Sequence, residues 1–136
     1  MKRIFALLAI ITCMAIGTAN AQTYAYRTTA FAMKQVTSYG VWTDWTDWQS
    51  SDMLITINFD TDVIKIYSPM TQIYRITKHV SNYRDNSGGT QSEYRFIDQD
   101  GDIGTLRLRI EINGNSQIYI DFSNVMWVYN VVRINL

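Results

Sequence analysis

The chain has 136 residues, a length typical of one domain rather than two. Its 12 basic and 12 acidic side chains balance, so it lacks the basic excess with which nucleic-acid-binding proteins neutralise phosphates. With 47% hydrophobic and 18% charged residues, the chain is too apolar to be disordered. We therefore expect a globular protein that does not have nucleic acid as its partner.

The first 21 residues have the features of a secretory signal peptide. Lys2 and Arg3 precede an apolar run over residues 4–16, and small residues occupy both key positions of the segment 19–21. This pattern predicts cleavage after Ala21. The protein is then expected to be periplasmic or secreted.

Two alternatives concern the same segment. An uncleaved anchor is disfavoured because the apolar run is shorter than the roughly 20 residues of a spanning helix. Lipidation of Cys13 is disfavoured because this cysteine lies inside the apolar run and no small residue precedes it. Cleavage leaves a single domain at 22–136 without cysteine, so neither a disulfide nor a membrane span is expected there.

Beyond the signal, apolar and polar residues alternate with period two, as in half-buried strands. Leu106 and Leu108, for example, alternate with Arg107 and Arg109. Turn residues separate such runs at short intervals. The pattern predicts nine strands, near residues 23–36, 40–48, 53–59, 63–67, 72–79, 91–98, 103–112, 117–122 and 125–134.

The short links between these strands cannot form parallel crossovers, so the sheet is predicted to be antiparallel. The last run, 125–134, is apolar on both faces, which predicts that it is covered on two sides. The expected fold class is all-β, a meander of about eight to nine strands. We expect the sheet to be closed or strongly curled into a small lipocalin-like barrel.

One hairpin has a predictable register. Pairing Asp98 with Asp102 across a three-residue loop puts Gly101 at the left-handed position of a bulge and Glu93 opposite Arg107. A two-residue turn would instead set charged residues opposite leucines. The hydrophobic pattern therefore favours the three-residue loop.

The same loop contains three alternating carboxylates, from Asp98, Asp100 and Asp102, which resemble the start of a calcium-binding loop. However, Ile103 stands where that loop requires glycine, and Arg109 where it requires glutamate. A hairpin turn is favoured, and a weakly held cation is the alternative. No metal or cofactor is predicted.

Three tryptophans, Trp42, Trp45 and Trp48, alternate with threonine and aspartate in one short segment. They could stack on sugar rings or offer an aromatic surface to a protein partner. Alternatively, one or two of them could close the barrel end as core residues. On a regular strand, Trp42 and Trp48 would share one side and Trp45 would oppose them.

Tyr94, Trp127 and Tyr129 complete the candidate ligand-binding residues, because they could line a cavity inside the barrel. They could equally be ordinary strand residues. The one histidine, His79, adjoins no carboxylate in sequence and no nucleophile motif is present, so no catalytic residue is predicted. An enzyme that uses aspartates on loops is the last-ranked alternative.

Several features together resemble small exported proteins of gut Bacteroidetes that have no assigned function. They are the signal, the tryptophan segment, the hairpin from Asn58-Phe59-Asp60 to Ile66-Tyr67-Ser68, and the ending Met126-Trp127-Val128-Tyr129-Asn130. The resemblance implies export and provides no catalytic residues.

These observations predict a non-enzymatic, exported β-barrel binding module whose ligand is a small apolar molecule or a glycan. The alternative is a structural or interaction protein that uses an exposed aromatic edge to bind a protein partner or itself. A cavity lined by tyrosine and tryptophan would favour the first. A filled interior with an exposed tryptophan patch would favour the second.

Overall fold

The strands of the molecule follow the period-two runs of the sequence. The computed structural model describes residues 23–135, so the predicted signal peptide at 1–21 lies outside the described residues. Nine strands are present: β1 (Thr23–Gln35), β2 (Gln49–Ser50), β3 (Leu54–Asn58), β4 (Val63–Tyr67), β5 (Gln72–Arg84), β6 (Thr90–Ile97), β7 (Ile103–Ile110), β8 (Ser116–Asp121) and β9 (Val125–Ile134). The predicted all-β class is confirmed.

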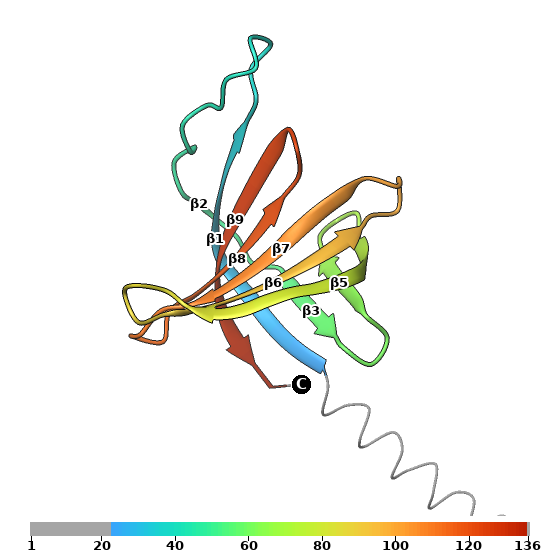
Figure 1. Ribbon diagram of the computed structural model, residues 1–136, viewed down its shortest axis with the longest axis vertical. Helices are drawn as coiled ribbons and strands as arrows, with labels where there is room; N and C mark the ends of the chain where they lie inside the picture. Colours follow the sequence, from blue (N-terminus) through green and yellow to red (C-terminus); the bar gives the residue numbers. More distant parts are fainter. Residues whose placement is uncertain (1–22, 136) are drawn as a thin grey trace, which may run out of the picture.

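The sheet closes on itself to form an eight-stranded antiparallel barrel (Figure 1). Strands β3 to β9 pair in sequence order, and β1 pairs with β3 on one side and β9 on the other. The two-residue strand β2 adds to β1 outside this ring. The predicted closed meander is confirmed. Within residues 23–135, no helix is long and apolar enough to cross a membrane.

Alternate residues of each strand point into the barrel and fill it with large apolar side chains. In β3 and β4, for example, Ile57 lies opposite Ile64 and Ile55 opposite Ile66, and all four are almost completely buried. The core continues around the ring with these buried residues: Tyr26, Tyr74, Ile76, Tyr94, Phe96, Leu106, Ile118, Ile120, Tyr129 and Val131. A contiguous core thus holds together a domain that has no disulfide in its described part.

Strand β5 is longer than the predicted 72–79, because it continues to Arg84 beside β6. Two register shifts interrupt this pairing, one after Ile76 and one after His79. Each bulge inserts an unpaired residue and increases the local twist. The extra length was not predicted because the bulges break the period-two pattern.

The β6–β7 hairpin has the predicted register. Glu93 lies opposite Arg107, and the amide of Asp98 donates to the carbonyl of Asp102 over 2.9 Å. Gly101 has a φ of 87°, as the three-residue loop requires. The prediction of a bulged hairpin is therefore confirmed.

Replacing Gly101 with alanine is expected to lower the free energy of unfolding by about 1 kcal/mol, because a side chain at positive φ is strained even in open space. No atom lies within 4 Å of the position that a Cβ of residue 101 would take, so backbone strain is the whole effect. Glu93→Ala should cost well under this amount. Urea denaturation of both variants tests the prediction, and equal costs would contradict it.

The predicted strand at 40–48 is wrong. In this segment the structure has one isolated bridge, between Val36 and Trp42, and the regular pairing of β2 begins only at Gln49. The chain between them runs beside β1 in an irregular extended form. Together with the end of β1, it projects beyond the rest of the barrel (Figure 1).

Candidate functional site

A pocket of about 440 Å³ opens at one end of the barrel. We call it the mouth pocket. Its lining comes from β1, the approach to β3, β5, the β6–β7 turn, and the neighbouring ends of β8 and β9: Phe31, Ser51, Met53, Gln72, Tyr74, Asp98, Gln99, Asp100, Ile120, Phe122, Trp127 and Tyr129. Large apolar side chains thus fill the rest of the barrel interior, and the interior is open at this end.

One wall of the mouth pocket consists of aromatic rings from β1 and β9. Trp127 and Tyr129 are two residues apart on β9 and therefore face the same way. Phe31 lies directly opposite Tyr129, and its ring centroid is 6.3 Å from those of both Trp127 and Tyr129. A register shift between Thr28 and Ala30 changes which β1 residues face inward, and it turns Phe31 into the pocket.

The opposite wall and the floor form a second aromatic group. Tyr74 and Phe122 line the pocket with ring centroids 6.2 Å apart. The fully buried ring of Phe96 lies beneath them, stacked on Tyr74 at 4.4 Å and edge-on to Phe122 at 5.5 Å. These offset and edge-to-face arrangements are favourable for aromatic pairs.

The ring of Phe96 fits beneath Tyr74 and Phe122 because the residue opposite Phe96 on the neighbouring strand β7 is a glycine. Gly104 lies directly opposite Phe96 in the ladder. A Cβ at Gly104 would come within 2.5 Å of Phe96 Cζ and 2.9 Å of the carbonyl oxygen of Asp121. The floor of the mouth pocket therefore depends on the missing side chain of Gly104.

The tyrosine hydroxyls of the pocket stay protonated at neutral pH. Burial raises the pKa of Tyr129 to about 12. Burial also raises the pKa of Tyr74, and the nearby Tyr129 and Asp98 raise it further. The Tyr74 hydroxyl donates a hydrogen bond to Gln72 Oε1. Both phenols are therefore neutral groups that can donate hydrogen bonds.

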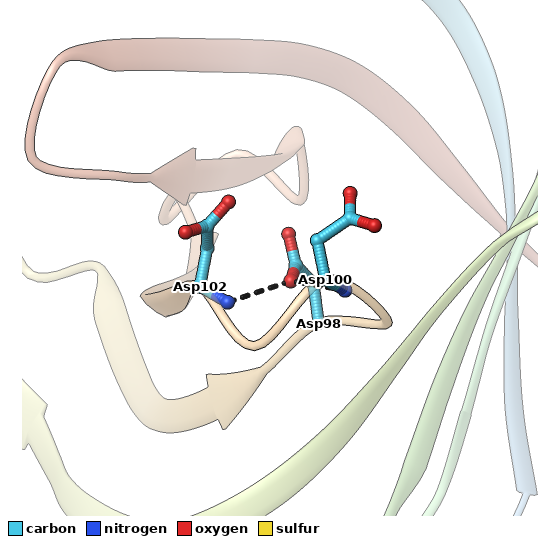
Figure 2. Close-up of side chains that lie close together, drawn as sticks. All are labelled: Asp98, Asp100 and Asp102. Atoms are coloured by element: carbon cyan, nitrogen blue, oxygen red, sulfur yellow. Dashed lines mark hydrogen bonds between the residues drawn. The ribbon is translucent and has the colours of Figure 1, made fainter.

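Three carboxylates lie together at the β6–β7 turn, where the sequence predicted a hairpin rather than a metal site (Figure 2). One ligand oxygen from each of Asp98, Asp100 and Asp102 lies within 4.8 Å of the others. Asp98 Oδ1 accepts hydrogen bonds from the amides of Asp100, over 2.9 Å, and Asp102, over 2.8 Å. Asp98 thus stabilises the turn, and Asp98 and Asp100 line the mouth pocket.

The tryptophan segment, residues 42–48, pairs with β1 through its threonines. Thr43 donates its amide to the carbonyl of Gln35 over 2.8 Å, and its Oγ1 accepts from the amide of Gln35 over 3.1 Å. Thr46 repeats both bonds with Met33, over 2.9 and 3.0 Å. Each Trp-Thr-Asp triplet therefore spans two residues of β1, because the threonine hydroxyl replaces one backbone carbonyl.

This three-for-two spacing places tryptophans of successive triplets on the same side. The ammonium group of Lys34 lies 5.5 Å from the ring centroid of Trp42 and 4.8 Å from that of Trp45. The prediction that Trp45 opposes Trp42 is therefore wrong. It assumed the two-residue repeat of a regular strand, which the threonines interrupt.

The tryptophan segment covers part of the outer face of the barrel. Ala32 and Val128 pair on β1 and β9 and are buried although they point outward. Trp45 approaches Tyr119, the β8 neighbour of Val128, with ring centroids 6.4 Å apart. We therefore place the Trp45 indole across this row. The prediction that the final strand is covered on two sides is confirmed at Val128.

The alternative that the tryptophans close the barrel as core residues is wrong. The exposed fractions of Trp42, Trp45 and Trp48 are 36%, 39% and 50%. All three are absent from the core cluster and from the lining of the mouth pocket. They form an exposed outer surface.

Replacing Trp48 with alanine is expected to lower the free energy of unfolding by about 1 kcal/mol, because half of the side chain is already in water. Trp45→Ala should cost somewhat more, since Trp45 also contacts Tyr119 and Lys34. Chemical denaturation of the two variants tests this. A loss of about 3–5 kcal/mol, typical of a buried aromatic residue, would contradict the exposed position of either tryptophan.

The structure brings some of the predicted candidates together and separates others. Trp127 and Tyr129 share the mouth pocket. Tyr94 is buried elsewhere in the core, with its ring 5.2 Å from that of Phe59 and 5.1 Å from that of His79. Sequence reasoning missed Phe31, Gln72 and Phe122 as lining residues. Comparison with known proteins found no matching family model, curated protein or solved structure.

Proposed function

We propose that the protein is an exported, non-enzymatic binding module that holds a small, largely apolar molecule in the mouth pocket. The observation that carries this proposal is the open pocket of about 440 Å³ with aromatic walls. Ligand sites of proteins are concave, have volumes of roughly 300–1,000 Å³ and combine apolar linings with a few polar groups. The signal-like residues 1–21 support export.

The composition of the lining supports binding rather than catalysis. Besides its tyrosines, the ionisable side chains of the lining are those of Asp98 and Asp100. The lining contains no histidine, lysine or cysteine, the side chains that most often serve as a base or nucleophile beside a carboxylate. Asp98 also accepts the hydrogen bonds that stabilise its own turn.

A neutral fluorescent probe, N-phenyl-1-naphthylamine, tests the proposal in titrations of the purified protein. We expect saturable binding with a blue-shifted emission, because the probe would leave water for the apolar pocket. Trp127→Ala should weaken binding at least about tenfold, the loss expected when a large aromatic contact is removed. Trp48→Ala is the matched control and should leave binding unchanged, since Trp48 lies outside the pocket.

Circular dichroism shows whether each variant is folded, and Phe122→Leu provides a milder change in the same wall. Failure of the wild-type protein to bind the probe would contradict the proposal. Binding that Trp48→Ala weakens and Trp127→Ala does not would place the site on the outer surface instead.

The exposed tryptophan segment favours a second candidate function, that of an interaction protein. A row of partly exposed indoles is typical of contact surfaces, where tryptophan is enriched at the positions that contribute most to affinity. Analytical ultracentrifugation of wild type and Trp48→Ala tests self-association through this surface. A monomeric wild-type protein up to high concentration would contradict binding to itself.

A further inference from the structure

The charged side chains that line the mouth pocket are all negative. Asp98 and Asp100 are the formally charged residues among its twelve lining residues, and lysine, arginine and histidine are missing from that lining. The ion pairs of residues 23–135 use other acids, namely Asp52, Asp62, Asp85 and Asp121. No basic side chain of the described chain therefore lies within salt-bridge distance of either pocket carboxylate.

The two turn carboxylates that line the mouth pocket keep acceptor oxygens without a donor among residues 23–135. One oxygen of Asp98 takes the two amide hydrogen bonds of the turn. The other oxygen of Asp98 and both oxygens of Asp100 accept no hydrogen bond from the residues that the structure describes. A ligand that places hydrogen-bond donors and positive charge here would satisfy these oxygens.

The aromatic walls also favour a positively charged ligand. The faces of aromatic rings attract cations, and the attraction grows as the site is desolvated. This chain uses such contacts elsewhere: the guanidinium carbon of Arg107 lies 4.2 Å from the ring centroid of Tyr119, and that of Arg133 lies 4.6 Å from Tyr24. In the mouth pocket, five aromatic rings line a cavity without a cation of its own: Phe31, Tyr74, Phe122, Trp127 and Tyr129.

We infer that the mouth pocket selects an amphipathic organic cation, a protonated amine or quaternary ammonium group carried on an apolar body. This inference rests on the proposed function, because it names the ligand class of the same pocket. The apolar body would lie against the aromatic walls and Ile120, and the ammonium group would lie at the entrance beside Asp100. An anionic amphiphile such as a fatty acid would meet two carboxylates there.

Acidic turns are common, and Asp98 also stabilises its own turn. What distinguishes Asp98 and Asp100 is the aromatic cavity that they border. Asp102 provides the matched comparison, since it belongs to the same cluster but does not line the mouth pocket.

Three probes with one apolar body and different charges test the inference: 4-phenylbutylamine, 4-phenylbutanol and 4-phenylbutyrate. Each competes with bound N-phenyl-1-naphthylamine at pH 7 and low ionic strength. We expect the amine to compete at least about fivefold better than the alcohol, the size of one charge–charge contact near a surface, and the carboxylate to compete least. Added sodium chloride should reduce the advantage of the amine.

Asp100→Asn should remove most of the preference for the amine over the alcohol, each measured as displacement of the fluorescent probe from that same variant. Asp102→Asn should retain most of that preference. Both substitutions keep a polar side chain of similar size in the turn, so the fold should be preserved.

The outcomes separate the two proposals. If the wild-type protein binds the fluorescent probe but the alcohol or the carboxylate competes as well as the amine, the cation inference is wrong and the binding function stands. If the fluorescent probe does not bind, the proposed function fails. If calcium chloride, compared with sodium chloride of equal ionic strength, selectively abolishes the amine preference, the carboxylates hold a metal ion and the inference is overturned.

Discussion

Gly104→Ala is expected to lower the free energy of unfolding by about 2–3 kcal/mol and to weaken binding of the fluorescent probe in the mouth pocket. The added methyl group would lie 2.5 Å from the ring of Phe96 and 2.9 Å from the carbonyl oxygen of Asp121, so both must move. Overpacking of a well-filled core typically costs about 1–3 kcal/mol. Urea denaturation measures the loss of stability.

Gly101→Ala is the matched control, since it adds the same methyl group in open space. Its cost of about 1 kcal/mol comes from the backbone, and it should leave binding of the fluorescent probe intact. Equal stability of the Gly104 variant and the wild type would show that the ring of Phe96 does not lie against β7.

Phe96→Ala is expected to lower the free energy of unfolding by about 3–5 kcal/mol, because the side chain is fully buried and its removal leaves a cavity. Tyr74 and Phe122 lose the ring on which they pack, so the floor of the mouth pocket should become irregular. Thermal unfolding and probe titration measure the two effects. A loss below about 1 kcal/mol would contradict the buried position.

The two substitutions should not be additive. In the Phe96→Ala background the ring that Gly104→Ala would strike is absent, so the added methyl group should cost less there than in the wild type. The contact with the Asp121 carbonyl remains and keeps part of the cost. A double-mutant cycle with a coupling energy of about 1 kcal/mol or more would confirm the contact, and strict additivity would contradict it.

The sequence was sufficient to predict the eight barrel strands, apart from the end of β5, and one complete register. Regular alternation predicts the inward face of β7, and a glycine at the third loop position fixes the pairing of Glu93 with Arg107. The tryptophan segment was mispredicted because side-chain hydroxyls take the place of backbone carbonyls. Thr43 and Thr46 change the repeat from two residues to three, and propensity rules do not include this exchange.

The mouth pocket could be predicted only in part. Trp127 and Tyr129 were recognised because one strand carries both. Phe31 joins them through closure of the barrel between β1 and β9, and through a register shift that the sequence pattern does not show. Tyr74 and Phe122 reach the same end from β5 and from the turn after β8. Their meeting depends on how far each strand is staggered around the ring, which alternation within single strands does not determine.

The threonine-mediated pairing also determines what kind of edge residues 42–48 present to other chains. Another chain can add a strand to a free sheet edge, because the edge has unpaired amides and carbonyls. Such pairing requires these groups at regular two-residue intervals. The outer edge of residues 42–48 lacks that regularity, because its backbone advances three residues for every two of β1. The exposed carboxylates of Asp44 and Asp47 add repulsion between copies. The segment can therefore display indoles to solvent without serving as a template for sheet growth.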